Sequence, residues 1–264
     1  MNGIMTDGLF SNIGFDRYDW NARLRPALFT LLPALLLPAI WFGQVWTVYG
    51  SLVTLLTTCG LTYLLARLAR YRGRALEKRL VSQRGGQPSL LFLRHRDTSI
   101  NGPTKQRYHA LLRSRGLLVS TKEEEAADPT AADGLYQSAI DWLLEQTRDT
   151  RKFGMLLNEN IDYGFRRNLL GLKPIALVVS IATFFANISV LWVNYGTSET
   201  RVLAGYGLGV GLAAIILVWI FLVDESFVED SAASYAKRLL AQLENLSPAK
   251  AKLPPKYRQA AVDD

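Results

Sequence analysis

Charged residues are missing from three long stretches of this sequence. No Asp, Glu, Lys or Arg occurs in residues 26–66, 174–198 or 202–223. A helix needs about 20 apolar residues to cross the hydrocarbon core of a bilayer, so each stretch can span a membrane and the first can span it twice. The sequence therefore predicts an all-α membrane protein, with four transmembrane helices in two hairpins and a mainly helical cytoplasmic domain.

Residue types that carry catalysis or bind metals are scarce. Cys59 is the single cysteine, which excludes a disulfide within the chain, and the histidines are His95 and His109. A catalytic or metal site needs several such groups at set spacings, and the sequence contains neither a glycine-rich phosphate loop nor a zinc motif. The predicted spans also lack the acidic, basic and histidine side chains on which proton-coupled transporters and voltage sensors rely. We therefore expect no enzyme, no metal and no cofactor.

Basic residues flank the predicted spans on one side. They are Arg17, Arg23, Arg25, Arg67, Arg70, Arg72, Arg74, Lys78, Arg79, Arg166, Arg167 and Lys173. Because Lys and Arg accumulate on the cytoplasmic side of a membrane, this pattern predicts a multi-pass protein of the bacterial inner membrane with both termini in the cytoplasm. The expected segments are a cytoplasmic N-terminal segment at 1–25, transmembrane hairpins at 26–66 and 174–223, a cytoplasmic domain at 67–173, and a cytoplasmic C-terminal helix with a disordered tail at 224–264.

The segment between the two hairpins is polarised in charge. Residues 67–120 hold thirteen Lys/Arg and two acids, whereas residues 121–150 hold two basic residues and eight acids. Apolar periodicity and turn residues predict helices at 103–115, 134–150 and 225–246. The second span is expected to continue as a basic helix over 64–82, and an amphipathic segment at 158–174 is expected to run into the third span. We expect the stretch 120–134, STKEEEAADPTAADG, to be an exposed acidic loop.

A row of basic side chains on the predicted 103–115 helix is the candidate binding site. Lys105, His109 and Arg113 stand four residues apart and so share one helix face. Phosphates of a nucleotide or single-stranded oligonucleotide would contact such cations, and its bases would stack on the neighbouring rings. The candidate ligand residues are Arg94, His95, Arg96, Lys105, Arg107, Tyr108, His109, Arg113 and Arg115. The alternative is that the acidic loop neutralises these cations inside the protein.

Polar residues recur within the second and third spans. The candidates for lining a water-filled path are Thr54, Thr58, Thr62, Thr183, Asn187 and Asn194. The three threonines of the second span lie on one helix face together with Ser51. The alternative is packing, in which the hydroxyls bond back to their own helix and the asparagines link neighbouring helices.

Two further patterns concern packing. Glycines at 205, 207, 209 and 211 near the start of the fourth span would let a neighbouring helix approach closely. The C-terminal helix carries apolar residues at coiled-coil-like spacing, namely Ala232, Ala236, Leu239, Leu243 and Leu246. This stripe fits self-association and packing against the protein's own middle domain equally well.

The layout of four spans, both termini inside and a basic cytoplasmic domain resembles that of membrane effectors in nucleotide-signalled anti-phage defence. In outline it is similar to the channel-forming effector of the Hailong system. The resemblance implies a homo-oligomeric channel in contact with membrane lipids, whose cytoplasmic domain binds a nucleotide or oligonucleotide made by a partner nucleotidyltransferase. Such a ligand gates the channel only if it binds one state more tightly than the other. The alternatives are a non-conducting scaffold that recruits a cytoplasmic partner and a small-solute transporter.

Overall fold

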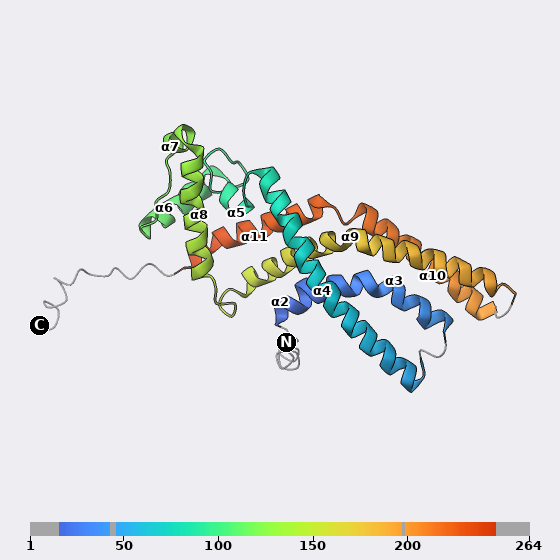
Figure 1. Ribbon diagram of the computed structural model, residues 1–264. Coiled ribbons are helices and arrows are strands. Elements are labelled where there is room, and N and C mark those ends of the chain that lie inside the picture. Colours follow the sequence, from blue (N-terminus) through green and yellow to red (C-terminus); the bar gives the residue numbers. More distant parts are fainter. Residues whose placement is uncertain (1–15, 43–45, 197–198, 247–264) are drawn as a thin grey trace, which may run out of the picture. The chain divides into compact units, whose positions relative to one another are not determined.

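The computed structural model describes residues 16–42, 46–196 and 199–246, and within them the chain is helical. The elements are α2 (Arg17–Asp19), the π-helical turn η1 (Trp20–Leu24), α3 (Arg25–Trp41), α4 (Val48–Arg84), α5 (Pro88–Leu91), α6 (Gly102–Ser114), α7 (Lys122–Ala127), α8 (Pro129–Gln146), α9 (Gly154–Val193), α10 (Glu199–Phe221) and α11 (Glu225–Asn245) (Figure 1). The predicted tail from Ser247 and the first fifteen residues lie outside the described residues.

Four of the described helical stretches are long and apolar enough to cross a membrane. They are Arg17–Trp41, Gly50–Leu91, Gly154–Val193 and Glu199–Phe221. The prediction of an all-α protein with four apolar spans is thereby confirmed, and the helix lengths support a multi-pass membrane protein. The segments 64–82 and 158–174 are continuous with the spans as predicted, because α4 and α9 run through them without a break.

The chain divides into two compact units. Unit 1 holds the described residues up to Gln87 together with Met155–Tyr235, and unit 2 holds Pro88–Gly154 together with the described residues from Ala236 onward. The domain expected at 67–173 contains Pro88–Gly154 of unit 2. Its two ends belong to unit 1, because the helices α4 and α9 carry them on directly from the spans.

In unit 1, Pro26 shapes the start of the first span. A proline has no N–H, and its ring clashes with the carbonyl four residues earlier, here that of Ala22. The helix widens into η1 immediately before this point. The side-chain amide of Asn168 on α9 donates to the Ala22 carbonyl over 2.7 Å, and Asn168 is fully buried. The free carbonyl left by the proline therefore becomes a tie between η1 and α9.

Glycines let α4 and α9 cross at close range. A Cβ added to Gly171 would lie 2.8 Å from the backbone nitrogen of Gly73, and a Cβ added to Gly73 would collide with the side-chain oxygen of Asn168. At the same crossing, Arg72 donates from Nε to the Gly171 carbonyl over 2.8 Å. Backbone atoms cannot come this close past a side chain, so the crossing requires glycine on both helices.

The last two spans, α9 and α10, lie side by side (Figure 1). The side-chain amide of Asn187 on α9 donates to the Gly205 carbonyl on α10 over 2.9 Å. Of the glycines predicted to allow close packing, Gly205 and Gly209 face neighbouring side chains, whereas a Cβ on Gly207 or Gly211 would meet nothing within 4 Å. Close packing is thus confined to one face of α10.

Unit 2 contains a helical core around α8. Tyr136, Ile140 and Leu143 are buried as the predicted stripe requires, whereas Leu144 is 39% exposed. On α11, Leu239 and Leu243 are buried within the chain itself. Their burial favours packing against the protein's own domain over self-association of the C-terminal helix.

The stretch 120–134 is not the predicted loop. Thr121 caps α7 by accepting from the Glu124 N–H, and the Glu124 side chain accepts from the Thr121 N–H in return. Asp128 then caps α8, accepting from the amides of Thr130 and Ala131, with Pro129 at the first helical position. Such a reciprocal capping box satisfies two backbone donors, which explains why so acidic a segment is helical.

Candidate functional site

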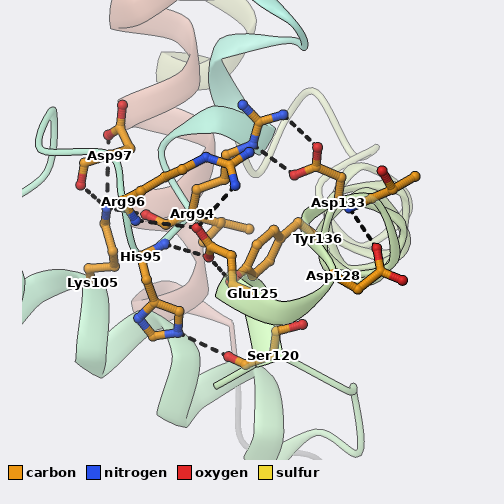
Figure 2. A network of polar contacts seen from close by, with 12 residues as sticks. Arg94, His95, Arg96, Asp97, Lys105, Ser120, Glu125, Asp128, Asp133 and Tyr136 are labelled. Carbon is orange, nitrogen blue, oxygen red and sulfur yellow. Dashed lines mark hydrogen bonds and ion pairs between the residues drawn. The ribbon is translucent and has the colours of Figure 1, made fainter. Parts of the chain in front are cut away.

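A buried carboxylate organises the region predicted to bind a ligand. Glu125 on α7 is 3% exposed, and its oxygens accept hydrogen bonds from the backbone amide of His95 over 2.7 Å and from the Tyr136 hydroxyl over 2.7 Å (Figure 2). The Arg96 amide also donates to it, and the Arg96 guanidinium lies 3.7 Å away. The carboxylate therefore holds the segment that carries the predicted ligand residues in place.

The pKa of Glu125 reflects these contacts. Burial alone opposes ionisation, but the hydrogen bonds from the His95 amide, from Tyr136 and from the Arg96 amide outweigh it and hold the pKa below its usual value. Burial raises the pKa of Tyr136, and so does the hydrogen bond that its hydroxyl donates to Glu125. Glu125 is thus an ionised acceptor at neutral pH rather than a proton donor.

Arg94 is also held by an acid of the same unit. Its Nε donates to one oxygen of Asp133 over 2.7 Å, and its Nη2 donates to the other over 2.6 Å (Figure 2). This two-point geometry is the one that a guanidinium would offer to a phosphate. In this structure the α8 carboxylate occupies that position.

Lys105 and His109, in the middle of the predicted basic row, point inward. The Lys105 ammonium donates to the carbonyls of Arg94, over 2.5 Å, and Asp97, and the lysine is 5% exposed. A His109 ring nitrogen donates to the Leu93 carbonyl over 2.8 Å, and the residue is 2% exposed. Burial lowers the pKa of Lys105, and it lowers the pKa of His109 to about 4, so this imidazole is neutral at physiological pH.

The remaining predicted ligand residues have partners within unit 2 as well. Arg107 pairs with Glu244 over 2.7 Å, Arg115 donates to the Leu246 carbonyl over 3.0 Å, and the ring of Tyr108 is buried. Arg113 is exposed and makes long hydrogen bonds, of 3.3 and 3.5 Å, to two backbone carbonyls. Arg113 and Arg96 are therefore the predicted cations with the weakest internal contacts.

Of the expected row of three basic side chains, Lys105 and His109 face the interior of unit 2, whereas Arg113 is exposed. The reason is the segment 92–97, whose carbonyls need donors and find them in Lys105 and His109. This arrangement corresponds to the internal alternative, with Asp133, Glu125 and Glu244 as the acids. Binding of a nucleotide by these residues stays a prediction, and any such ligand would compete with partners already in place.

The six predicted pore-lining residues fall into two groups. Thr183 and Asn187 are buried, and Asn187 links helices, since it accepts from the Trp41 indole N–H over 2.9 Å and donates to Gly205. Asn194 is half-buried and donates to the Val190 carbonyl of its own helix. On α9 the two asparagines thus serve packing.

The threonines of α4 behave differently. Thr62 is buried, and its hydroxyl has no hydrogen-bond partner in the part of the chain that the structure describes. Thr54 and Thr58 are half-buried, and they too form no hydrogen bond with any described residue. By contrast, Thr30 and Ser180 each donate to the carbonyl four residues earlier. These three threonines therefore do not form the expected bond back to their own helix.

The outer part of α4 is also sparsely covered by the rest of the chain. Figure 1 shows α3 and α4 diverging toward the connection between them. Only 17% of the apolar window of this span is buried, against 39% for the first span. Leu56 is 65% exposed, and a Cβ on Gly60 would meet nothing within 4 Å. The threonines are the most covered positions of this stretch, so the exposed surface of outer α4 lies on its other faces.

Sequence reasoning missed a groove between α9 and α10. It has a volume of about 840 Å³ and is lined by Phe184, Asn187, Ile188, Leu191, Trp192, Tyr195, Tyr206, Gly209, Val210 and Ala213. The aromatic residues near the 195–202 turn indicate a position at the membrane–water interface. A groove also needs a second helix, and the sequence of one helix does not identify that partner.

Among the described residues, no cluster of three or more His, Cys, Asp or Glu could hold a metal ion. No family model, no curated protein and no solved structure matches this chain.

Proposed function

We propose that this protein is an oligomeric channel of the bacterial inner membrane, with the threonine face of α4 lining the path. The observation that carries the proposal is the set of unpaired hydroxyls of Thr54, Thr58 and Thr62. A polar group inside a membrane is costly unless it meets a hydrogen-bond partner, and water in a path or a neighbouring copy would supply one.

The sparse cover of α4 supports the oligomeric part of the proposal. A span that touches little of its own chain is available to neighbouring copies, and an oligomer would enclose a path that the half-buried hydroxyls of Thr54 and Thr58 border. The apolar side of α4, which includes Leu56, would then face lipid. Because residues 26–66, 174–198 and 202–223 contain no Asp, Glu, Lys or Arg, uncharged groups would line the path.

Unit 2 is the regulatory part in this proposal, in line with the architectural resemblance to anti-phage effectors. A nucleotide or single-stranded oligonucleotide would first contact Arg96 and Arg113, which have the weakest internal contacts. Lys105 and His109 would become available only if segment 92–97 moved away from α6. A ligand that binds more tightly when segment 92–97 has moved away from α6 would stabilise that state, and with it one state of the channel.

The single native cysteine allows a sharp test of the path. In a Cys59→Ala background, the full chain carries either Thr58→Cys or, on the opposite face of α4, Leu56→Cys, and is reconstituted in liposomes. A water-soluble thiol reagent is expected to modify the Thr58 position and reduce ion flux at least about tenfold, with the Leu56 position unmodified. Absence of flux from the parent protein would refute the channel and favour the scaffold or the transporter.

The regulatory part needs its own measurement. Short single-stranded DNA is titrated against the full chain at low and moderate salt, and Arg96→Gln/Arg113→Gln is compared with Arg148→Gln/Arg151→Gln, which removes the same charge from exposed positions. The first pair is expected to weaken binding and reduce its salt dependence, whereas the second is expected to leave both unchanged. Equal effects of the two pairs, or no binding by the parent, would refute a nucleotide site in unit 2.

A further inference from the structure

Four arginines of unit 1 gather where η1 packs on α4. Arg67, Arg70 and Arg74 follow a spacing of three and four residues, which places them on one side of α4. Arg23 comes from η1. Repulsion by Arg23 is the largest electrostatic influence on Arg70, followed by repulsion from Arg74. The cluster therefore combines cations from two elements, and Arg23 lies more than forty positions from each of the α4 arginines.

Small side chains bring these two elements together. Ala66 is buried with Leu24 and Ala27 in one apolar cluster, and Ala69, one turn further along α4, is fully buried. Alanine leaves space for a close approach between helices, as at other small-residue interfaces in membranes. The packing thus forces Arg23 beside Arg70 although the like charges repel each other.

Few acids offset this charge. Asp19 pairs with Arg23 and is the one acid that acts appreciably on Arg70. Arg70 and Arg74 form no hydrogen bond or ion pair with any described residue, and the Nε of Arg70 is enclosed without a partner. Buried or crowded guanidinium groups are normally matched by an anion. The arrangement lacks such an anion within the chain that the structure describes.

The position along α4 indicates where the missing anion comes from. The cluster begins directly after the last apolar turn of the span, and Arg67 donates to the Tyr63 hydroxyl over 2.7 Å, with its guanidinium 5.2 Å from the ring centre. A half-exposed tyrosine beside arginines at the end of a span is typical of the headgroup level of a bilayer.

From this juxtaposition we infer a binding site for a phosphate-bearing anion, formed by Arg23, Arg67, Arg70 and Arg74, and we assign its occupant as the headgroup of an anionic phospholipid. Guanidinium groups bind phosphate oxygens in pairs, with charge assistance. A phosphodiester at this depth would meet the open donors of Arg70 and Arg74 while its acyl chains stay beside the apolar part of α4. The site is independent of the proposed channel, since a scaffold or a transporter would present the same arginines.

The test counts lipids that remain bound to the full chain. The protein in detergent is incubated with phosphatidylglycerol or with phosphatidylcholine, and retained lipid is measured by native mass spectrometry. Phosphatidylglycerol is expected to be retained in preference, and Arg70→Gln/Arg74→Gln is expected to weaken its retention about tenfold. The control Arg148→Gln/Arg151→Gln removes two exposed positive charges from unit 2 and is expected to bind like the parent.

A competition experiment distinguishes free phosphate from lipid as the source of the anion, and a single variant replaces the double variant if the latter misfolds. Millimolar inorganic phosphate that displaces the lipid would show that the phosphate group alone suffices, whereas lipid that stays bound would show that the acyl chains contribute as well. If the double variant does not fold, the exposed Arg74→Gln alone is used, with a smaller expected loss of retention. Equal retention of both lipids by the parent, or equal retention of phosphatidylglycerol by parent and variant, would overturn the site.

Discussion

Trp41 at the end of α3 donates its indole N–H to the side-chain oxygen of Asn187 in α9 over 2.9 Å. Asn187 uses its amide to reach the Gly205 carbonyl of α10 over 2.9 Å, so one buried side chain connects three spans. Both halves of the amide are satisfied, which removes the cost of placing it inside a membrane.

Replacing Asn187 with leucine is expected to lower the stability of the full chain in detergent by about 1–2 kcal/mol, because it leaves the Trp41 N–H and the Gly205 carbonyl without their partner. The apparent midpoint of thermal unfolding measures the loss. Ser189→Ala serves as the control, since that exposed hydroxyl bonds only to its own helix at Phe185. A similar midpoint for both variants would contradict the linking role of Asn187.

Gly171→Ala is expected to disrupt the crossing of α4 and α9. The new methyl group would meet the Gly73 backbone at 2.8 Å, where no flexible side chain can give way, and overpacking of this kind costs about 3 kcal/mol. Yield of folded protein and the thermal midpoint report the effect. Gly60→Ala, on α4 but with open space around it, is expected to cost nothing, and a loss there would show that glycine matters for another reason.

Glu125→Gln is expected to destabilise unit 2 by about 2 kcal/mol, because the amide cannot accept all the hydrogen bonds that the carboxylate receives. Limited proteolysis of the 88–154 segment measures local opening. Glu123→Gln makes the same chemical change at an exposed position of α7 and is expected to leave the cleavage rate unchanged. Equal cleavage of the two variants would show that Glu125 does not organise the domain.

Acid is expected to destabilise unit 2 through His109. Its pKa lies near 4 in the folded chain and near 6.5 when exposed, so the unfolded state binds the extra proton between these values. The stabilising contribution is complete above about pH 6.5 and falls by about 1.4 kcal/mol per pH unit toward pH 4. Thermal midpoints between pH 5 and 7 test this. His109→Gln can still donate to the Leu93 carbonyl but does not titrate, and it is expected to flatten the profile; an unchanged slope would exclude His109 as its source.

The regular elements of this fold follow from the sequence more readily than its contacts. Uncharged runs and apolar periodicity predict the spans, α6 and α11, because burial in lipid or in a core is what those patterns describe. The segment 120–134 was predicted wrongly as a loop, although its Thr121–Glu124 capping box is legible in the sequence. The loop prediction rests on the acidity of the segment and overlooks this capping box, which marks the start of a helix.

The candidate site was harder to predict because it depends on partners distant in sequence. Which of three successive glutamates is buried depends on how α7 lies against segment 92–97, and periodicity places Lys105 on a face without saying whether that face is covered. The sequence predicts that Asn187 either lines a path or links helices, but its partner Trp41 lies 146 positions away. No single-sequence pattern connects residues at that separation.

The glycine crossing has a mechanical consequence. At about 1.5 Å per residue, the part of α4 between Val48 and Gly73 forms an unbroken rod of about 37 Å. Pivoting that rod by about 10° at the crossing would swing its far end by about 6 Å, since a helix without internal proline bends little. A shift of α4 by less than an ångström next to the crossing would therefore displace the far end of the helix by more than the width of a water molecule.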